Sequence, residues 1–184
     1  MDYHELMIAG TGGRGILLIG RLLARAGMYK YKHVSFFPNY GPAMRGGESE
    51  CTVILSDNFV GSPVILNPAH VIVMASSMLT LMEKRVKPGG FLILDSSVIP
   101  AKVARDDITI YYIPATEKAT SLGDNQAANM VLLGAYVEAS KALTLNFVEK
   151  ALEDRLQGES KRSILSSNKK ALNEGAKLMA SYDL

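Results

Sequence analysis

The sequence contains no tryptophan and only one cysteine, Cys51, among 184 residues. One thiol cannot form an internal disulfide, and it cannot build a zinc or iron–sulfur site that requires several thiolates. Cys51 lies in the apolar run CTVILS, where we expect a small buried side chain. The three histidines, His4, His33 and His70, are far apart, and no histidine-plus-carboxylate spacing indicates a metal site.

Long hydrophobic runs and an excess of one charge are also missing. No segment has the roughly 18 consecutive apolar residues of a membrane span, and no basic region precedes the short apolar run near the N-terminus, as a secretory signal would require. Twenty basic and 18 acidic residues leave a net charge of +2, which favours no nucleic-acid partner. We therefore expect a cytoplasmic protein without membrane or nucleic-acid partners, built as a single domain over residues 1–184.

Short apolar runs alternate with helical patterns along the chain. The apolar runs predict strands at 5–10, 33–37, 51–56, 71–76, 91–97 and 108–115. Helical periodicity predicts helices at 16–28, 77–86, 125–140, 145–157 and 167–182. The strand runs are continuously apolar, which is typical of a parallel sheet covered on both faces. The predicted fold is α/β: a Rossmann-like, mostly parallel sheet with helices on both faces and a helical C-terminal end.

The stretch FFPNYGPAMRGGES, residues 36–49, interrupts this pattern. It contains two prolines and three glycines, which argue against a continuous helix or strand. We expect a connection of about a dozen residues here, and connections of that length in compact domains are mostly functional or disordered. Its aromatic and apolar residues argue against disorder, so we expect the connection to contact a ligand or another protein.

A glycine-rich motif, GTGGRG, follows the first predicted strand and begins the first predicted helix. Its G-x-G-x-x-G pattern is formed by Gly10, Gly12 and Gly15, with Gly13 and Arg14 between the last two. Glycines allow a tight turn, and amides at a helix N-terminus attract an anion. An NAD site would also need an acid at the end of the second strand, and residues 32–45 contain none. Three interpretations remain. The motif is a tight turn that binds no ligand, or it binds a phosphate-bearing ligand or contributes to a site shared with another protein. The third, an independent NAD site, is disfavoured by the missing acid.

Several polar side chains outside the motif have two interpretations each. Arg14, Arg21 and Arg25 are spaced to line one side of the first predicted helix. They form either a solvated face whose apolar stems cover the sheet edge, or an interface for an acidic partner or a phosphate. Asp95 ends a predicted strand, where it either faces a ligand or, with the serines after it, turns the chain and caps the next element.

The predicted helix 125–140 begins with two asparagines one turn apart. Asn125 and Asn129 are candidates to contact the glycine loop or a ligand, and Asn125 is equally a candidate helix cap. The helix is apolar on more than one side, so we expect it to be central to the domain rather than covered by a partner. The preceding residues, LGDN, begin like a thiamine-diphosphate motif, but Asn125 stands where that motif requires glycine.

Five segments occur in a characteristic order: GTGGRGILLIGRLLARAG, FFPNYGPAMRGGESECTVILSD, GSPVI, VKPGGFLILDSS and NQAANMVLLGA. Together they resemble the gamma subunit of the 2-oxoacid:ferredoxin oxidoreductases, from about residue 5 to about residue 142. The glycine loop alone would not identify this family, whereas the long connection and the asparagine-containing helix are specific. GSPVI and NYGPAMRGGES are most similar to the 2-oxoglutarate (2-ketoglutarate) branch, although the pyruvate, branched-chain ketoisovalerate and indolepyruvate branches share much of the pattern.

The resemblance implies that the whole enzyme oxidatively decarboxylates a 2-oxoacid, forms an acyl-coenzyme A and passes electrons to ferredoxin. It places thiamine diphosphate and magnesium on alpha and beta subunits, and iron–sulfur clusters on a beta or ferredoxin-like subunit. The chain itself would then be a Rossmann-like subunit that binds no cofactor alone, carries no catalytic residue and is inactive in isolation. The alternatives are a free-standing nucleotide-dependent oxidoreductase and a small-ligand-binding Rossmann-like protein.

The resemblance also implies that the long connection packs against the catalytic subunits and helps to shape the active site or the coenzyme A channel. The expected interface residues are Asn39, Tyr40, Gly41, Arg45, Gly46 and Gly47. The expected phosphate or coenzyme A contacts are Gly10, Gly12, Gly13, Arg14, Gly15 and Arg45. Arg45 would bind a phosphate or a partner carboxylate, or alternatively pair with Glu48 or Glu50. Without its partners the chain would expose apolar surface, which favours a homo-oligomer.

Overall fold

The computed structural model describes residues 2–40, 47–158 and 161–182. Its six strands form a sheet in the order β2-β3-β1-β4-β5-β6. The strands are β1 (Tyr3–Thr11), β2 (His33–Tyr40), β3 (Glu48–Ser56), β4 (His70–Val73), β5 (Phe91–Asp95) and β6 (Thr109–Ile113). The helices are α1 (Ile16–Gly27), α2 (Ser76–Arg85), α3 (Ala115–Ser121), α4 (Ala128–Ser140), α5 (Leu145–Arg155) and α6 (Arg162–Ala180), with a 3-10 turn, η1 (Asn125–Ala127), before α4.

Five of the six strands run in the same direction. β1, β4, β5 and β6 are parallel, whereas β3 is antiparallel to both of its neighbours, β1 and β2. β2 therefore points the same way as β1, and the prediction of a mostly parallel α/β sheet is confirmed. The ends of these five strands meet at one edge of the sheet, which we call the carboxyl edge.

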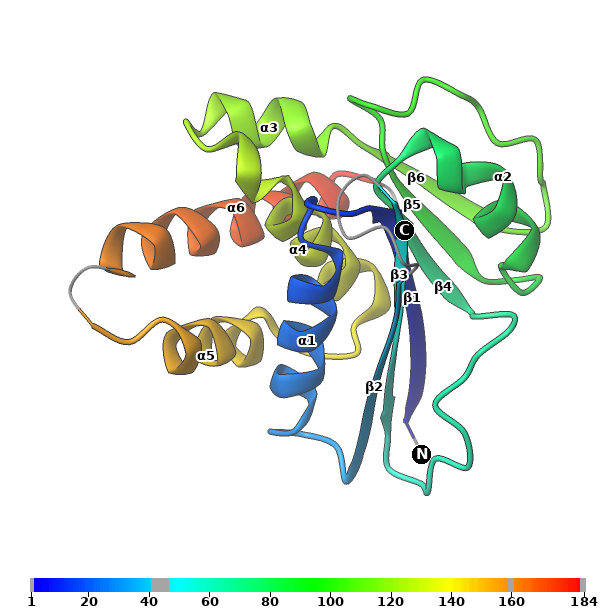
Figure 1. The fold of residues 1–184 in the computed structure, drawn as a ribbon, viewed down its shortest axis with the longest axis horizontal. Helices are drawn as coiled ribbons and strands as arrows, with labels where there is room; N and C mark the ends of the chain where they lie inside the picture. The colour runs from blue at the N-terminus through cyan, green and yellow to red at the C-terminus, as the bar shows by residue number, and fades with distance from the viewer. Residues whose placement is uncertain (1, 41–46, 159–160, 183–184) are drawn as a thin grey trace.

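Helices cover both faces of the sheet, as predicted, but unequally. α1, α3, α4, α5 and α6 lie on one face and α2 lies on the other (Figure 1). The side chains of β1 alternate between the two cores: Leu6 and Ile8 pack on the helix-rich side, and Met7 and Ala9 pack on the side of α2. Because both faces of β1 are buried, its sequence is a continuous apolar run rather than an alternating one.

α4 is the central helix of the helix-rich layer. Every residue from Ala128 to Val137 is buried. A Cβ atom at Gly134 would overlap the carbonyl oxygen of Leu172 in α6, so the two helix backbones approach closely at this point. This confirms the expectation that α4 is buried within its own chain. Of the helices in the described ranges, none has both the length and the apolar character that a transmembrane helix needs.

The connection predicted over residues 36–49 is shorter than expected. β2 continues to Tyr40 and β3 begins at Glu48, with Asn39 opposite Glu50 and Pro38 opposite Cys51. The predicted strand boundaries at residues 37 and 51 were therefore wrong, since both strands extend into this stretch. β2 is an edge strand, where the missing N–H of a proline is tolerated. Residues 41–46, which include Gly41, Arg45 and Gly46, lie outside the described residues.

The sequence patterns did not predict α3. The strand expected at 108–115 ends at Ile113, and α3 begins at Ala115. The buried carboxylate of Asp95 accepts hydrogen bonds from the backbone N–H groups of Ala115 (3.1 Å) and Thr116 (3.2 Å) and from the Thr116 hydroxyl (2.6 Å). Asp95 therefore caps α3 from another strand, a signal that no local sequence window contains. The capping interpretation of Asp95 holds, and the ligand interpretation does not.

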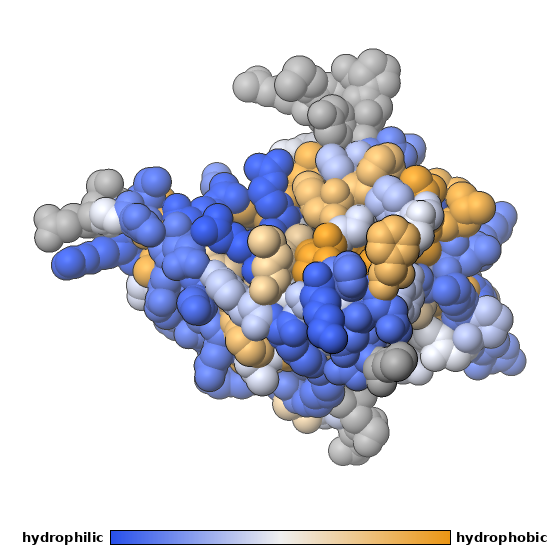
Figure 2. Space-filling model, turned by 90° about the horizontal axis from the view of Figure 1, so that it is seen from below, coloured by the Kyte–Doolittle hydropathy of each residue, from blue (hydrophilic) through white to orange (hydrophobic). Residues whose placement is uncertain are grey.

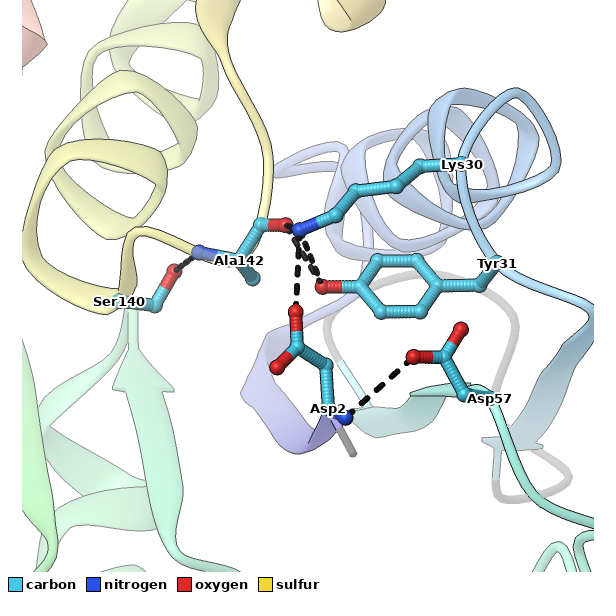
Figure 3. A network of polar contacts seen from close by, with 6 residues as sticks. All are labelled: Asp2, Lys30, Tyr31, Asp57, Ser140 and Ala142. Atoms are coloured by element: carbon cyan, nitrogen blue, oxygen red, sulfur yellow. Dashed lines mark hydrogen bonds and ion pairs between the residues drawn. The ribbon is translucent and has the colours of Figure 1, made fainter.

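The opposite edge of the sheet, where β1 begins, is joined to the helical layer by a polar network (Figure 3). The ammonium of Lys30 donates to the Asp2 carboxylate (3.4 Å), to the Tyr31 hydroxyl (3.1 Å) and to the Ala142 carbonyl (2.9 Å). The Tyr31 hydroxyl donates to the same carbonyl at 2.7 Å. Because Ala142 lies between α4 and α5, these bonds connect the end of α4 to the residues before β1 and β2 at this edge of the sheet.

Candidate functional site

The glycine loop lies at the carboxyl edge, between the end of β1 and the start of α1. Gly13 and Gly15 have positive φ angles, 95° and 77°, which side chains of L-residues disfavour. Gly10 has another role: a Cβ atom there would lie 3.0 Å from Ile16 and 3.1 Å from Met74, so its absence allows β1, α1 and β4 to pack. The predicted tight turn between strand and helix is confirmed.

The N-terminus of α1 has no side-chain cap. Gly15 occupies the N-cap position, and the first turn contains no acidic residue. Backbone N–H groups at such an end carry partial positive charge and need acceptors. Asn129 of α4 lies against Gly15 and is only 6% exposed, and its side chain makes no hydrogen bond to another described residue. The helix end and the Asn129 amide therefore place hydrogen-bond donors side by side.

Only one of the two predicted asparagines takes part in this arrangement. Asn125 is exposed in η1, and the cap of η1 is Asp124, whose carboxylate accepts a hydrogen bond from the Gln126 backbone N–H at 3.1 Å. The same carboxylate accepts a bond from Ser167 of α6 at 2.8 Å. The alternative that Asn125 caps this helix was therefore wrong.

The glycine loop contacts the end of the β2–β3 connection directly. The backbone N–H of Gly12 donates to the carbonyl oxygen of Gly47 at 2.9 Å. Two segments that the sequence singled out separately are thus neighbours, because β3 pairs with β1 along its full length. Gly12 shapes the loop, but its N–H is already occupied by Gly47. Arg14, in the same loop, is exposed to solvent.

Asn39 belongs to a network of polar side chains that the sequence patterns did not predict. Its amide donates to the Glu50 carboxylate at 2.9 Å, and Arg85 of α2 pairs with the other Glu50 oxygen at 3.1 Å. Both oxygens of Glu50 therefore have partners among the described residues. Arg85 has no distinctive sequence context, and only the packing of α2 on the sheet brings it here. Tyr40 ends β2, and its side chain lies outside the described residues.

Two of the three arginines assigned to one side of the first helix, Arg21 and Arg25, follow the first of their two interpretations. The Arg21 guanidinium lies 5.8 Å from the centroid of the Phe36 ring, and Arg25 is 3.9 Å from the Asp154 carboxylate of α5. Arg21 therefore covers an aromatic side chain at the sheet edge, and Arg25 faces a carboxylate of its own chain. These contacts need no external acidic partner.

Cys51 is fully buried beneath α1. Its sulfur would lie 2.5 Å from a Cβ atom at Gly20, so the absence of a side chain at Gly20 makes room for it. Burial raises the pKa of the Cys51 thiol to about 12, which keeps the thiol protonated and unsuited to binding a cluster or acting as a nucleophile. Across the described ranges, no three histidine, cysteine or acidic side chains gather into a possible metal site.

Comparison with known proteins finds relatives over most of the chain. Residues 5–178 match the family model described as pyruvate ferredoxin/flavodoxin oxidoreductase. A 2-oxoglutarate synthase subunit KorC from Methanocaldococcus jannaschii is 30% identical over 169 residues, which cover 90% of this chain and 90% of that protein. A ketoisovalerate oxidoreductase subunit VorA from Methanothermobacter thermautotrophicus is 33% identical over 173 residues, 94% of this chain but 35% of that protein. The chain thus spans about a third of the length of this VorA relative.

A solved structure shares the fold over nearly the full length of both chains. The gamma subunit of a keto/oxoacid ferredoxin oxidoreductase from Geobacter sulfurreducens is similar with a TM-score of 0.85 and 26% identity, over 98% of each chain. The mixed sheet and its unequal helical layers are therefore an architecture that this chain has in common with such a subunit.

Proposed function

The chain belongs to the pyruvate ferredoxin/flavodoxin oxidoreductase family, and we propose that it acts as the gamma subunit of a 2-oxoacid:ferredoxin oxidoreductase. The observation that carries this proposal is the match to a KorC subunit over 90% of both chains, together with the family match over residues 5–178. The proposal takes residues 1–184 as a single gamma-type domain of a cytoplasmic enzyme. The preferred substrate is 2-oxoglutarate, supported by KorC relatives, and ketoisovalerate is the alternative, supported by the VorA relative.

In this proposal the redox chemistry belongs to partner subunits. Thiamine diphosphate with magnesium would supply the decarboxylation chemistry and iron–sulfur clusters would carry electrons to ferredoxin, all on alpha, beta or ferredoxin-like subunits. This chain does not fit a cluster, since its one thiol is buried with a raised pKa. Its contribution would be to complete the site for the acyl acceptor, coenzyme A.

The glycine loop has the features that a coenzyme A phosphate requires. Gly13 and Gly15 hold the backbone in a left-handed turn, α1 directs its N-terminal amides toward the loop, and Asn129 adds a buried amide. Such a helix end stabilises an anion through partial charge and N–H donors. Arg14 lies exposed in the loop, so a phosphate could also contact its guanidinium. Arg45 remains the proposed second cation, and Asn39, Tyr40, Gly41, Gly46 and Gly47 the proposed interface to the catalytic subunits.

The test uses the reconstituted complex and its KM for coenzyme A. Asn129→Asp, which places a carboxylate at the proposed anion site, should raise this KM by about tenfold or more and leave kcat nearly unchanged. Arg45→Ala should raise KM in the same direction. Asn125→Asp, one turn earlier on the exposed side, is the matched control. If the folded Asn129→Asp variant in an intact complex has the wild-type KM for coenzyme A, the phosphate role is wrong. If the wild-type complex shows no coenzyme A-dependent oxidation of a 2-oxoacid, the proposed function itself is wrong.

The sheet order disfavours a free-standing NAD enzyme. A dinucleotide fold pairs its first and second strands and places the ribose-binding acid at the end of the second. Here β3 lies between β1 and β2, and β2 ends in Asn39 and Tyr40. The end of β2 is therefore one strand farther from the glycine loop than an NAD ribose would require, and it carries no acid. No observation favours a separate small-ligand-binding function.

A further inference from the structure

The face of the sheet that carries α2 is only partly covered. On this face, residues 57–69 pass over β3: Thr52 donates to the carbonyl oxygen of Pro63, and Val64 and Ile65 line a small pocket together with Phe37. Phe37 projects from β2 on the same face, in register with Thr52. We call Phe37, Phe59, Val64 and Leu66 the open-face patch.

The open-face patch collects much of the exposed apolar surface of the chain. Phe59 is 83% exposed, Leu66 71% and Val64 52%. Eight large hydrophobic side chains are exposed among the described residues, and six of them lie on the α2 side of the sheet. Besides the three just named, these are Phe37, Tyr3 of β1 and Leu81 of α2. Figure 2 shows hydrophobic residues gathered on the α2 side of the molecule, seen from below, with hydrophilic residues over much of the remaining view. Exposed apolar side chains gathered on one side of a molecule are typical of a docking surface.

The segment that presents Val64 and Leu66 is held firmly to the fold. Arg85 donates to the carbonyl oxygens of Ile65 (3.1 Å) and Leu66 (2.8 Å), and Thr52 donates to that of Pro63 (2.9 Å). The side chain of Ile65 is buried, while its two neighbours point outward. Since the backbone is fixed by these bonds, the exposure of Val64 and Leu66 is a property of the folded chain and not of a loose loop.

A basic groove borders the patch. It has a volume of about 530 Å³ and is lined by Asn67, the neighbour of Leu66, and by Lys84, Val86, Lys87, Pro88 and Arg105. Lys87 pairs with Glu5 and Arg105 pairs with Asp107. Lys84 is exposed and forms no ion pair with any described residue. A complementary surface would therefore place apolar side chains on the patch and carboxylates in the groove.

The VorA relative indicates that this fold can be joined to a further protein region in one chain. In the VorA relative, the matching region makes up 35% of a longer chain, so another protein region is joined covalently to the same fold. We propose that the open-face patch docks the thiamine-bearing catalytic subunit, through an apolar segment flanked by carboxylates. This inference rests on the proposed function and adds the surface by which the subunits join. Phe37 is two residues from Asn39, so a subunit docked here would extend toward the carboxyl edge and the glycine loop.

The test measures binding of isolated gamma chain to immobilised wild-type catalytic subunits. Leu66→Asp should raise Kd by at least about tenfold, and Val64→Asp combined with Leu66→Asp by more, because central apolar contacts dominate interface affinity. Lys84→Glu should weaken binding and reduce its salt dependence. Met28→Asp and Ile164→Asp are the matched controls, since these residues are 70% and 51% exposed away from the α2 side. Urea unfolding of each variant verifies that its fold is intact.

Three outcomes separate the possibilities. If wild-type chain binds and both aspartate variants of the patch bind equally well, the proposed surface is wrong while the proposed function stands. If wild-type chain fails to bind thiamine-bearing subunits at all, the proposed function is wrong. If Leu66→Asp abolishes a dimer of the isolated chain without changing Kd for the catalytic subunits, the patch is covered by a second copy, and the proposal is overturned.

Discussion

The side-chain nitrogen of Asn129 lies against Gly15, so close that a Cβ atom at Gly15 would overlap it. The N-terminus of α1 is therefore shaped by a residue of α4, and the loop cannot accept a side chain at this position without displacing that residue. This contact links the glycine loop to the most buried helix of the molecule. Glycine is therefore required at this position for two reasons: its φ is 77°, and a Cβ atom would overlap the Asn129 side chain.

Gly15→Ala should destabilise the protein by about 2–4 kcal/mol, since an unfavourable left-handed conformation and steric overlap both contribute. Gly13→Ala is the control, because its φ is 95° but no atom lies within 4 Å of the added methyl group. That variant should lose only about 1 kcal/mol. Urea titration measures both. The overlap should be relieved in Gly15→Ala combined with Asn129→Ala; equal losses for the two single variants would contradict the contact.

Gly134→Ala should cost about 3 kcal/mol or more, although alanine is the better helix former by about 1 kcal/mol. The added methyl group would meet the backbone carbonyl of Leu172, which cannot rotate away as a side chain can. The unfolding free energy from a guanidinium titration provides the measurement. Gly61→Ala, with no atom within 4 Å, should stay within about 0.5 kcal/mol of wild type. A similarly small effect at Gly134 would show that α4 and α6 are not in backbone contact.

His70 should make the protein less stable in acid. Burial, and secondarily the nearby His4, lower the pKa of His70 from 6.5 to about 4, and its ring stacks on Phe91 with Nδ1 lacking a described partner. Between pH 6.5 and 4 the unfolded chain binds a proton that the folded chain does not. The free energy of unfolding should therefore fall by about 2–3 kcal/mol as the pH is lowered over this range. Above pH 6.5 His70 is neutral in both states, and the free energy of unfolding should no longer depend on it.

The variant His70→Phe tests this assignment by unfolding titrations at several pH values. It keeps an aromatic ring against Phe91 but cannot be protonated, so its stability should change less between pH 6.5 and 4. An identical slope for His70→Phe and wild type would contradict the prediction.

Cys51 should be inert in the native protein. Its side chain is fully buried and its pKa is raised to about 12, so almost no thiolate forms at pH 8. A thiol reagent such as DTNB should label the folded chain only at the rate of unfolding, and label it quickly in guanidinium chloride. Rapid stoichiometric labelling of the folded chain would show that α1 does not cover this residue.

Most of the elements were predictable because their signals are local. The runs LMIA of β1 and FLIL of β5 are continuously apolar because helices or loops cover both faces of their strands, and the GTGGRG turn requires glycine for its own backbone angles. The failures have a common cause. α3 depends on Asp95, which caps it from a neighbouring strand, and the ends of β2 and β3 depend on their pairing across residues that contain proline and glycine. A local window contains neither partner.

The candidate site divides in the same way. Gly13, Gly15 and Asn129 were visible as candidates, because residue type and position relative to strand and helix are local properties. The bond between Gly12 and Gly47 and the pairing of Arg85 with Glu50 join segments distant in the chain, and no pattern around Arg85 distinguishes it from another surface arginine.

The sequence alone determined the class of fold, the glycine turn and the absence of a multi-thiolate site, since these follow from periodicity, backbone freedom and composition. The tertiary structure alone decided that β3 lies antiparallel between β1 and β2, that Asn129 lies against Gly15, and that the segment between β3 and β4 exposes Val64 and Leu66. Those features are relations between distant residues, and burial and hydrogen bonding assign them only when the whole chain has packed.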